Sequence, residues 1–481
     1  MGGRGNTFCI ALFSGIWGLE RLSLTLFHLC VANFLTTIAQ STRVAMMGTI
    51  YIVVQTIPLV VLSLYMGIWL DNTERRKVIP RALLVKVIGV SLTLFLSAMM
   101  LLFDVTVGLF LMIPVLIVLI TLSAVTSCMH LVVRIATERI WVVLAANGDS
   151  CSSRFLVKCN SAMSISTDVG QVFGLVVFER ALSGEWDCDG VFVFCGIVVL
   201  VFTALQYFLF RAVDKRCLPP EVISIHGQRR TVRAGIVEYM SQKETPVGVC
   251  WAARSTFTAV WFAATVMEHS PISVLYKWLY FVTTISTSIS YMFGMTRIKS
   301  HLILIAVAGA EIVAIILASA PVLSASFQVT GLKNKSTALD IAEHTVAVSF
   351  GELTPAVYSI ATHVLLALAL VLGTACDRAW NLTALQIYQE GVPRASRGVV
   401  GGVQSCLDYT ALSFHGLLAI TARGKEYVWT CALIGMILSV FNLLILFWWR
   451  HVRLGCSETV TLLRRRDLTV DLSYSNTGDM M

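Results

Sequence analysis

The sequence predicts an all-α membrane protein with about twelve transmembrane helices in two six-helix lobes. Of the 481 residues, 57% are hydrophobic and only 13% are charged, and the mean hydropathy is +0.79. A soluble protein could not bury that much apolar surface. In addition, apolar segments long enough to cross a bilayer recur along the chain in two sets of six.

The two sets define the expected organisation of the chain. Residues 1–211 form an N-terminal lobe and residues 246–449 a C-terminal lobe, joined by a polar, arginine-rich linker over 212–245 and followed by a polar tail over 450–481. The spans are expected at 8–38, 43–70, 79–103, 107–136, 155–182, 189–211, 246–267, 272–295, 300–321, 344–374, 395–422 and 427–449.

Basic residues predict how the chain is oriented in the membrane. Clusters of Lys and Arg follow spans two, four, six, eight and ten, the last of these including the stretch "DRAW", whereas the alternate loops are short or acidic. Because cytoplasmic loops carry an excess of Lys and Arg, we expect the linker and both termini to be cytoplasmic. The net charge of +8 then needs no nucleic-acid partner.

Two further patterns concern covalent modification. Asn334 lies in a glycosylation sequon in a predicted outer loop, which would place the protein on the secretory route, with the plasma membrane as its expected destination. The 13 cysteines lack regular spacing and lie mostly within apolar runs. They are therefore expected to act as small hydrophobic residues rather than as a disulfide framework.

A loop motif follows the second span, in "GIWLDNTERRK" at residues 67–77. Its Gly67, Asp71, Arg75 and Arg76 match, in degenerate form, the loop signature of the major facilitator superfamily. A small residue lets two helices approach, and a carboxylate can pair with arginines across a cytoplasmic gate in one conformation and separate in the other. The alternative is an ordinary basic cytoplasmic loop.

Ionisable residues inside apolar spans are the main functional candidates, because a charge in the bilayer is costly. Glu20 and Arg21 lie in span one, where they either serve function or pair with neighbouring helices. Asp168 lies in a polar patch of span five and either lines a cavity or belongs to a structural cluster. Glu311 is the lone charge of span nine and is either a proton-coupling site or an interhelical contact.

Span eleven carries two such residues, Asp408 and His415. Seven residues are two helical turns, so both side chains face nearly the same way, roughly 10.5 Å apart along the axis. They suit two points along one path; the alternative for His415 is a core histidine with satisfied hydrogen bonds, which in general is the commoner case.

Residues 379–420 resemble the tenth-to-eleventh helix region of the ferroportins, the cellular iron exporters. The loop around Asp71 and Arg75 and the stretch around Trp141 resemble the same family. The matching residues of the first region are Leu382, Thr383, Gln386, Gln389, Glu390, Arg397, Gly398, Gly402, Val403, Gln404, Tyr409 and His415.

The resemblance implies a major facilitator-like fold with a metal site in each lobe. In the C-terminal lobe the family pairs a helix-seven cysteine with a helix-eleven histidine; the histidine is His415, and the cysteine position falls near Val266. In the N-terminal lobe, Glu20 and Asp168 match the family's acids, and Leu24 stands at its histidine position.

The function that the resemblance implies is export of Fe(II) or a related divalent metal by alternating access. Glu20, Asp168 and His415 would hold the metal, with Asp408 as a further carboxylate on the same path, and these ligands suit such ions. The partners expected are the metal as substrate and the lipid bilayer, with no cofactor and a monomer as the default.

Two alternatives remain open at this point. One is a facilitator-fold transporter of an organic solute, in which Glu311 and Arg254 would bind substrate or couple protons. The other is a transport-inactive binding protein or receptor, suggested by the missing family ligands. We find no acyltransferase, protease or P-loop pattern, so the sequence does not predict an enzyme.

Overall fold

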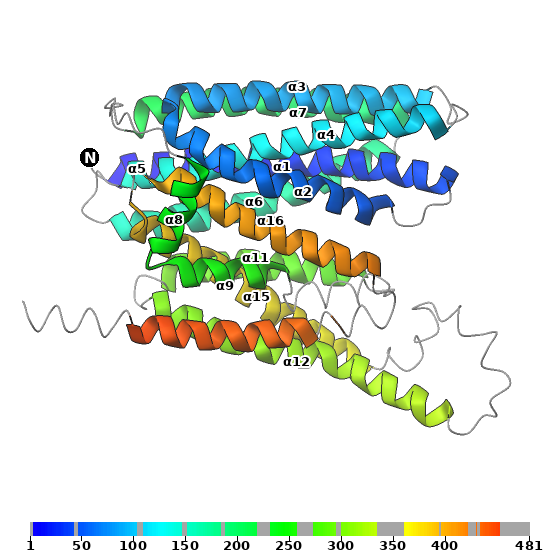
Figure 1. The fold of residues 1–481 in the computed structure, drawn as a ribbon, viewed down its shortest axis with the longest axis vertical. Helices are drawn as coiled ribbons and strands as arrows, with labels where there is room; N and C mark the ends of the chain where they lie inside the picture. The colour runs from blue at the N-terminus through cyan, green and yellow to red at the C-terminus, as the bar shows by residue number, and fades with distance from the viewer. Residues whose placement is uncertain are drawn as a thin grey trace, which may run out of the picture.

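The structure, a computed structural model, consists of helices and short connections in its described part, which contains no β-strand (Figure 1). This part comprises residues 3–42, 47–102, 109–146, 152–183, 188–218, 231–256, 273–294, 300–333, 360–393, 396–421, 430 and 433–452. At some positions within these ranges, among them Arg75 and His415, the structure describes the backbone but not the side chain.

The helices before the linker form what we call the N-terminal lobe. They are α1 (Gly3–Thr42), α2 (Met47–Asn72), α3 (Arg75–Leu102), α4 (Leu109–Ile135), the π-helical segment η1 (Ala136–Trp141), α5 (Val142–Ala146), α6 (Ser152–Ser183) and α7 (Cys188–Arg216).

After the short helix α8 (Val232–Ser241) comes what we call the C-terminal lobe. Its described helices are α9 (Thr245–Thr256), α11 (Ser273–Gly294), α12 (Ser300–Lys333), α15 (Ile360–Gly391), α16 (Arg397–Thr421) and a last helix over Leu433–Val452. Within the described residues, nine helices are long and apolar enough to cross a membrane, which confirms a multi-pass, all-α membrane protein. The total of twelve spans stays a prediction.

The outer surface of α7 shows how these helices meet the bilayer. Four apolar side chains spaced four residues apart, Val193, Ile197, Val201 and Leu205, are exposed, whereas Phe192, on another face, is buried. In a soluble helix the exposed stripe would be polar. Here it is apolar because lipid, rather than water, covers it.

Helix α15 differs from its predicted span in a way that matters for function. The span was predicted to end at residue 374, with "DRAW" in a basic loop, but α15 continues to Gly391. Asp377 and Arg378 therefore lie in the middle of a long helix. The apolar run ends before the helix does, because the later residues face protein instead of lipid.

The two lobes approach most closely where α2 crosses α16. A Cβ atom added to Gly67 would lie 2.5 Å from the carbonyl oxygen of Gly398, and one added to Gly402 would lie 2.5 Å from that of Ser63. Real Cβ atoms do not come so near, so the crossing requires glycine. Small residues at such crossings let membrane helices pack backbone to backbone.

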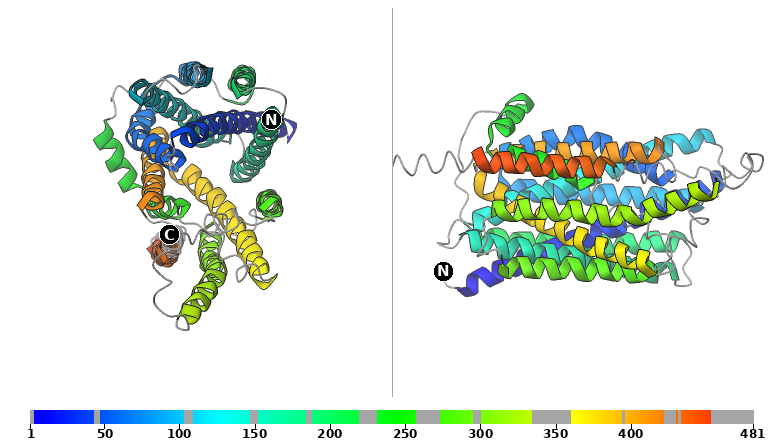
Figure 2. Two further views of the ribbon diagram at one scale, coloured as in Figure 1. Left: turned by 90° about the vertical axis from the view of Figure 1, so that its right-hand side faces the viewer. Right: turned by 90° about the horizontal axis from the view of Figure 1, so that it is seen from below.

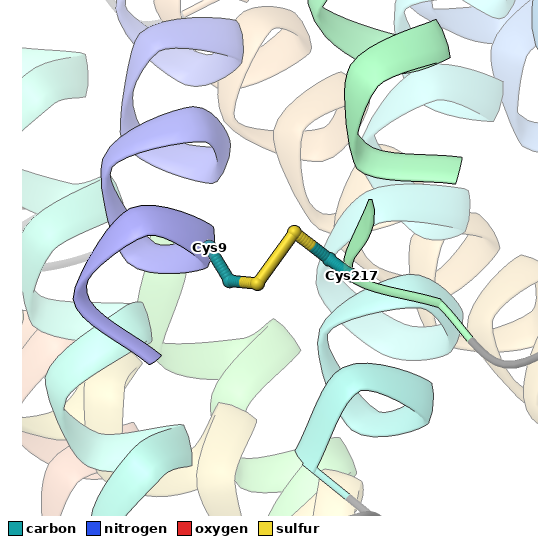
Figure 3. The surroundings of a disulfide bond; sticks show 2 residues. All are labelled: Cys9 and Cys217. Carbon is teal, nitrogen blue, oxygen red and sulfur yellow. A yellow bond between two sulfur atoms is a disulfide. The ribbon is translucent and has the colours of Figure 1, made fainter. Parts of the chain in front are cut away.

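The beginning of α1 and the end of α7 lie at the same end of the bundle as α8, which we call the α8 end (Figures 1 and 2). A disulfide joins Cys9 of α1 to Cys217 just after α7, with their Cα atoms 5.8 Å apart (Figure 3). The expectation that the cysteines act only as small hydrophobic residues was thus wrong for this pair. Spacing along the chain could not reveal it, because the two positions are 208 residues apart.

Candidate functional site

Asp168 lies midway along α6 and forms an ion pair with Arg378 of α15, so the contact joins the two lobes. The guanidinium donates from Nη2 to Asp168 Oδ1 over 2.5 Å and from Nη1 to Ser164 Oγ over 2.8 Å. The side chains are 7% and 15% exposed for Asp168 and Arg378. Asp168 therefore faces the other lobe, and a guanidinium from that lobe pairs with it.

A second guanidinium lies beside this pair. Arg21 of α1 donates two hydrogen bonds, of 3.0 and 3.3 Å, to Oε1 of Gln171, which lies one turn beyond Asp168 on α6. Arg21 is also within electrostatic range of Asp168, Arg378 and Tyr280 of α11. Positive charge consequently predominates around the carboxylate.

Glu20 points away from Asp168, into the interior of the N-terminal lobe. Its Oε2 accepts hydrogen bonds from Lys86 Nζ over 2.7 Å and from Gln206 Nε2 over 2.6 Å, and its Oε1 contacts His130 Nδ1. Adjacent helical residues point about 100° apart, so Arg21 and Glu20 face different surroundings. The geometry favours the structural alternative for Glu20.

Sequence reasoning missed the partners of Glu20. Lys86 is completely buried in α3, within the apolar run "ALLVKVIGV". A lysine in such a run is itself an intramembrane charge that demands a partner, and it was the available signal. His130 and Gln206, from α4 and α7, complete the cluster.

Glu311 is not isolated either. Arg254 of α9 donates from Nε to Glu311 Oε2 over 2.6 Å and from Nη1 to Asp377 Oδ1 over 3.0 Å, while its guanidinium lies 5.2 Å from the ring centroid of Trp380. Arg254 and Glu311 are almost fully buried. This network links α9, α12 and α15 within one lobe, which favours the interhelical alternative for Glu311.

Asp71 closes the α8 end between the lobes. Its two carboxylate oxygens accept the backbone N–H groups of Gly398 over 2.9 Å and of Val399 over 2.8 Å, at the beginning of α16. A carboxylate at a helix N-terminus satisfies free donors and the helix dipole. Of the two predicted gate arginines, Arg76 pairs with Asp214 of α7 over 3.1 Å, and the side chain of Arg75 lies outside the described part.

Further hydrogen bonds between α6 and α15 close the same end. Asn160 Nδ2 donates to Gln389 Oε1 over 2.7 Å, and Ser153 Oγ donates to Glu390 Oε1 over 3.0 Å. Gln389 also donates to the carbonyl of Glu138 in η1. Gln389 and Glu390, two of the residues that match the family pattern, thus make interlobe contacts.

Asp408 lies on α16 in a polar network with α8 and α9. Gln404 Nε2 donates to Asp408 Oδ1 and to the carbonyl of Gly248, each over 3.0 Å, and Tyr239 donates to Gln404 Oε1 over 2.9 Å. Burial raises the pKa of Tyr239 to about 12, so its hydroxyl remains a donor. Arg134 and Arg139 lie within electrostatic range of Asp408.

The remaining predicted positions are only partly covered by the structure. His415 lies on α16 two turns after Asp408, but its side chain is outside the described residues, as are Val266 and Asn334. Within the described part, no three His, Cys, Asp or Glu side chains gather as a metal site would require. Glu20, Asp168, Glu311 and Asp408 each have a cationic neighbour instead.

Comparison with solved structures shows which fold the chain has. A bacterial homologue of the iron transporter ferroportin in its outward-facing state, also solved with soaked iron, superposes with TM-scores of 0.72 and 0.69 at 14% and 13% identity, covering 92% of this chain and 99% of that one. The proton:xylose symporter XylE of the major facilitator superfamily gives 0.60 at 14% identity, covering 92% of this chain and 96% of that one. The chain therefore has a major facilitator-like fold.

The sequence then identifies the family. Residues 8–438 match the Ferroportin1 (FPN1) family, and the chain belongs to it. A comparison with curated proteins gives no match. The inward-facing state of the bacterial homologue superposes with a TM-score of only 0.55, at 14% identity over 93% of this chain and 99% of that one. The chain thus superposes better on the outward-facing structure than on the inward-facing one.

Proposed function

We propose that this protein is a twelve-span transporter that exports Fe(II) or a related divalent metal by alternating access. The observation that carries the proposal is the position of Asp168, a family-matched carboxylate at the middle of α6 that faces the opposite lobe. Membership of the ferroportin family and the iron soaked into the bacterial homologue support a metal as substrate.

The transport path runs between the lobes, with Asp168 on one side and α16, which carries Asp408 and His415, on the other. Opening of the α8 end would require Asp71 to leave Gly398 and Val399 and the lobes to separate. A metal then binds at Asp168 only if Arg378 moves aside. Glu20 stays in the N-terminal lobe as a structural charge.

Metal efflux from proteoliposomes tests this proposal. We expect efflux of radiolabelled iron and cobalt by the wild type, at least tenfold slower efflux with Asp168→Asn and with His415→Ala, and no change with Glu179→Gln. Glu179 is the matched control because it is an exposed carboxylate on the same helix as Asp168. No efflux of either metal by folded wild type would refute the proposal.

A second candidate function is transport of an organic anion, which the pair Arg21 and Arg378 favours. Two guanidinium groups near one carboxylate suit an anionic group better than a cation. Arg254 and Glu311, by contrast, are sealed within the C-terminal lobe. Uptake of carboxylates that is abolished by Arg21→Gln, together with no metal flux, would select this candidate.

A further inference from the structure

We propose that Arg378 is a built-in counter-cation, which takes the place of the transported metal on Asp168 whenever the protein carries no substrate. This inference rests on the proposed metal transport and concerns how the unloaded protein returns to its starting state. It is carried by the ion pair between α6 and α15.

The first argument is the cost of an unpaired charge. The Asp168 side chain is only 7% exposed, and a buried carboxylate that loses its partner is strongly destabilising. A transporter that releases its metal creates such a carboxylate in every cycle. A cation must neutralise the Asp168 carboxylate before the lobes can close over that carboxylate again.

The second argument is the origin and attachment of the guanidinium. Arg378 belongs to the opposite lobe and contacts two acceptors on α6, Asp168 and Ser164, which lie one helical turn apart. Ser164 is in turn 3.3 Å from Ser288 of α11. The lobe that would supply the other half of a metal site thus inserts its own cation into this half.

The third argument is that one hydrogen-bond donor of the Arg378 guanidinium has no acceptor among the described atoms. Among the described atoms, the buried Nε of Arg378 has no hydrogen-bond partner. Arg21, which stays hydrogen-bonded to Gln171, adds a like charge nearby. Both effects weaken the hold on Arg378, so a divalent ion can displace it, whereas a fully bonded guanidinium would be a permanent structural element.

These three observations give a cycle without an obligatory counter-ion. The metal binds Asp168 and Arg378 withdraws; after release, Arg378 returns and the neutralised, empty protein reorients. Without Arg378, the empty protein would have to reorient with a bare carboxylate. Reorientation with metal bound would remain possible, because the metal itself neutralises Asp168.

The test compares two fluxes of radiolabelled cobalt from proteoliposomes. Net efflux into metal-free buffer requires the empty protein to return, whereas exchange against unlabelled external cobalt does not. We expect the wild type to support both. We expect Arg378→Gln to keep exchange within about twofold and to slow net efflux at least tenfold, and Arg378→Lys to restore much of the net efflux, since an ammonium keeps the charge.

Arg81→Gln, which removes an exposed arginine of α3, is the matched control and should leave both fluxes unchanged. Equal net efflux and exchange in Arg378→Gln, either both retained or both lost to the same degree, would overturn the counter-cation. Absence of both fluxes in folded wild type would instead refute the proposed metal transport, so the two failures are distinguishable.

Discussion

Lys86 of α3 donates a hydrogen bond over 2.7 Å to Glu20 of α1, and both side chains lie inside the N-terminal lobe. Gln206 bonds to both residues and ties α7 to the same pair. The pair therefore fixes three helices relative to one another. We infer that this cluster holds α1, α3 and α7 together within the N-terminal lobe.

Removing only Lys86 should destabilise the protein strongly. Lys86→Met leaves the Glu20 carboxylate buried with less compensation, a change that costs about 3–5 kcal/mol in comparable pairs. We expect a lower melting temperature in detergent, and partial recovery in the double variant Lys86→Met/Glu20→Gln. Lys158→Met, at an exposed position of α6, serves as the control. A double variant no more stable than the single one would contradict this role.

The glycine crossing should control the opening of the α8 end. Gly67→Val adds a side chain where even a Cβ would lie 2.5 Å from a carbonyl oxygen, so α2 and α16 must separate. Spin labels placed on the two lobes at that end should show a longer distance than in the wild type. Gly309→Val on α12 is the matched control, because a Cβ there meets nothing within 4 Å. An unchanged distance in Gly67→Val would show that the crossing does not limit opening.

Asp71 should favour the closed state of the α8 end through the two hydrogen bonds that it accepts from the backbone N–H groups of Gly398 and Val399. Replacing a helix-capping carboxylate by Ala costs about 0.5–2 kcal/mol, and here the cap exists only while the lobes are together. Asp71→Ala should therefore shift the population towards the open α8 end by about fivefold for each 1 kcal/mol. Asp71→Asn keeps an acceptor and should have a smaller effect. The readout is alkylation of a cysteine introduced at the closed contact, and equal rates in all three proteins would exclude this role.

The disulfide makes a separate prediction about cysteine chemistry. After thiols are blocked during purification, peptide mapping without reductant should recover Cys9 linked to Cys217, and Cys9→Ser should leave Cys217 open to alkylation. Buried Cys128 should remain unmodified in the folded protein. The predicted orientation would put the pair on the reducing side of the membrane, where disulfides are rare. Recovery of both cysteines fully alkylated from native wild type would show that the bond is absent there.

Hydropathy predicted a multi-pass, all-α membrane protein, because lipid-facing stripes such as that of α7 require apolar residues all along the helix. Hydropathy could not predict that α15 continues to Gly391, since residues that face another lobe need not be apolar. For this reason Arg378 resembled a loop residue. The candidate carboxylates were found by their cost in the bilayer, but that cost says nothing about what neutralises them. Asp168 was paired with a residue 210 positions away, and only the packed structure brings those two together.

The link between Cys9 and Cys217 also changes how the protein responds to force. It closes almost the whole N-terminal lobe into one covalent ring whose ends are 208 positions apart in the sequence. A molecular motor or cantilever pulling on the N-terminus would extract the residues before Cys9 and would then pull on a covalent ring, whose residues cannot be extended one after another. At about 3.4 Å per residue, roughly 700 Å of contour length would stay hidden until the bond is reduced.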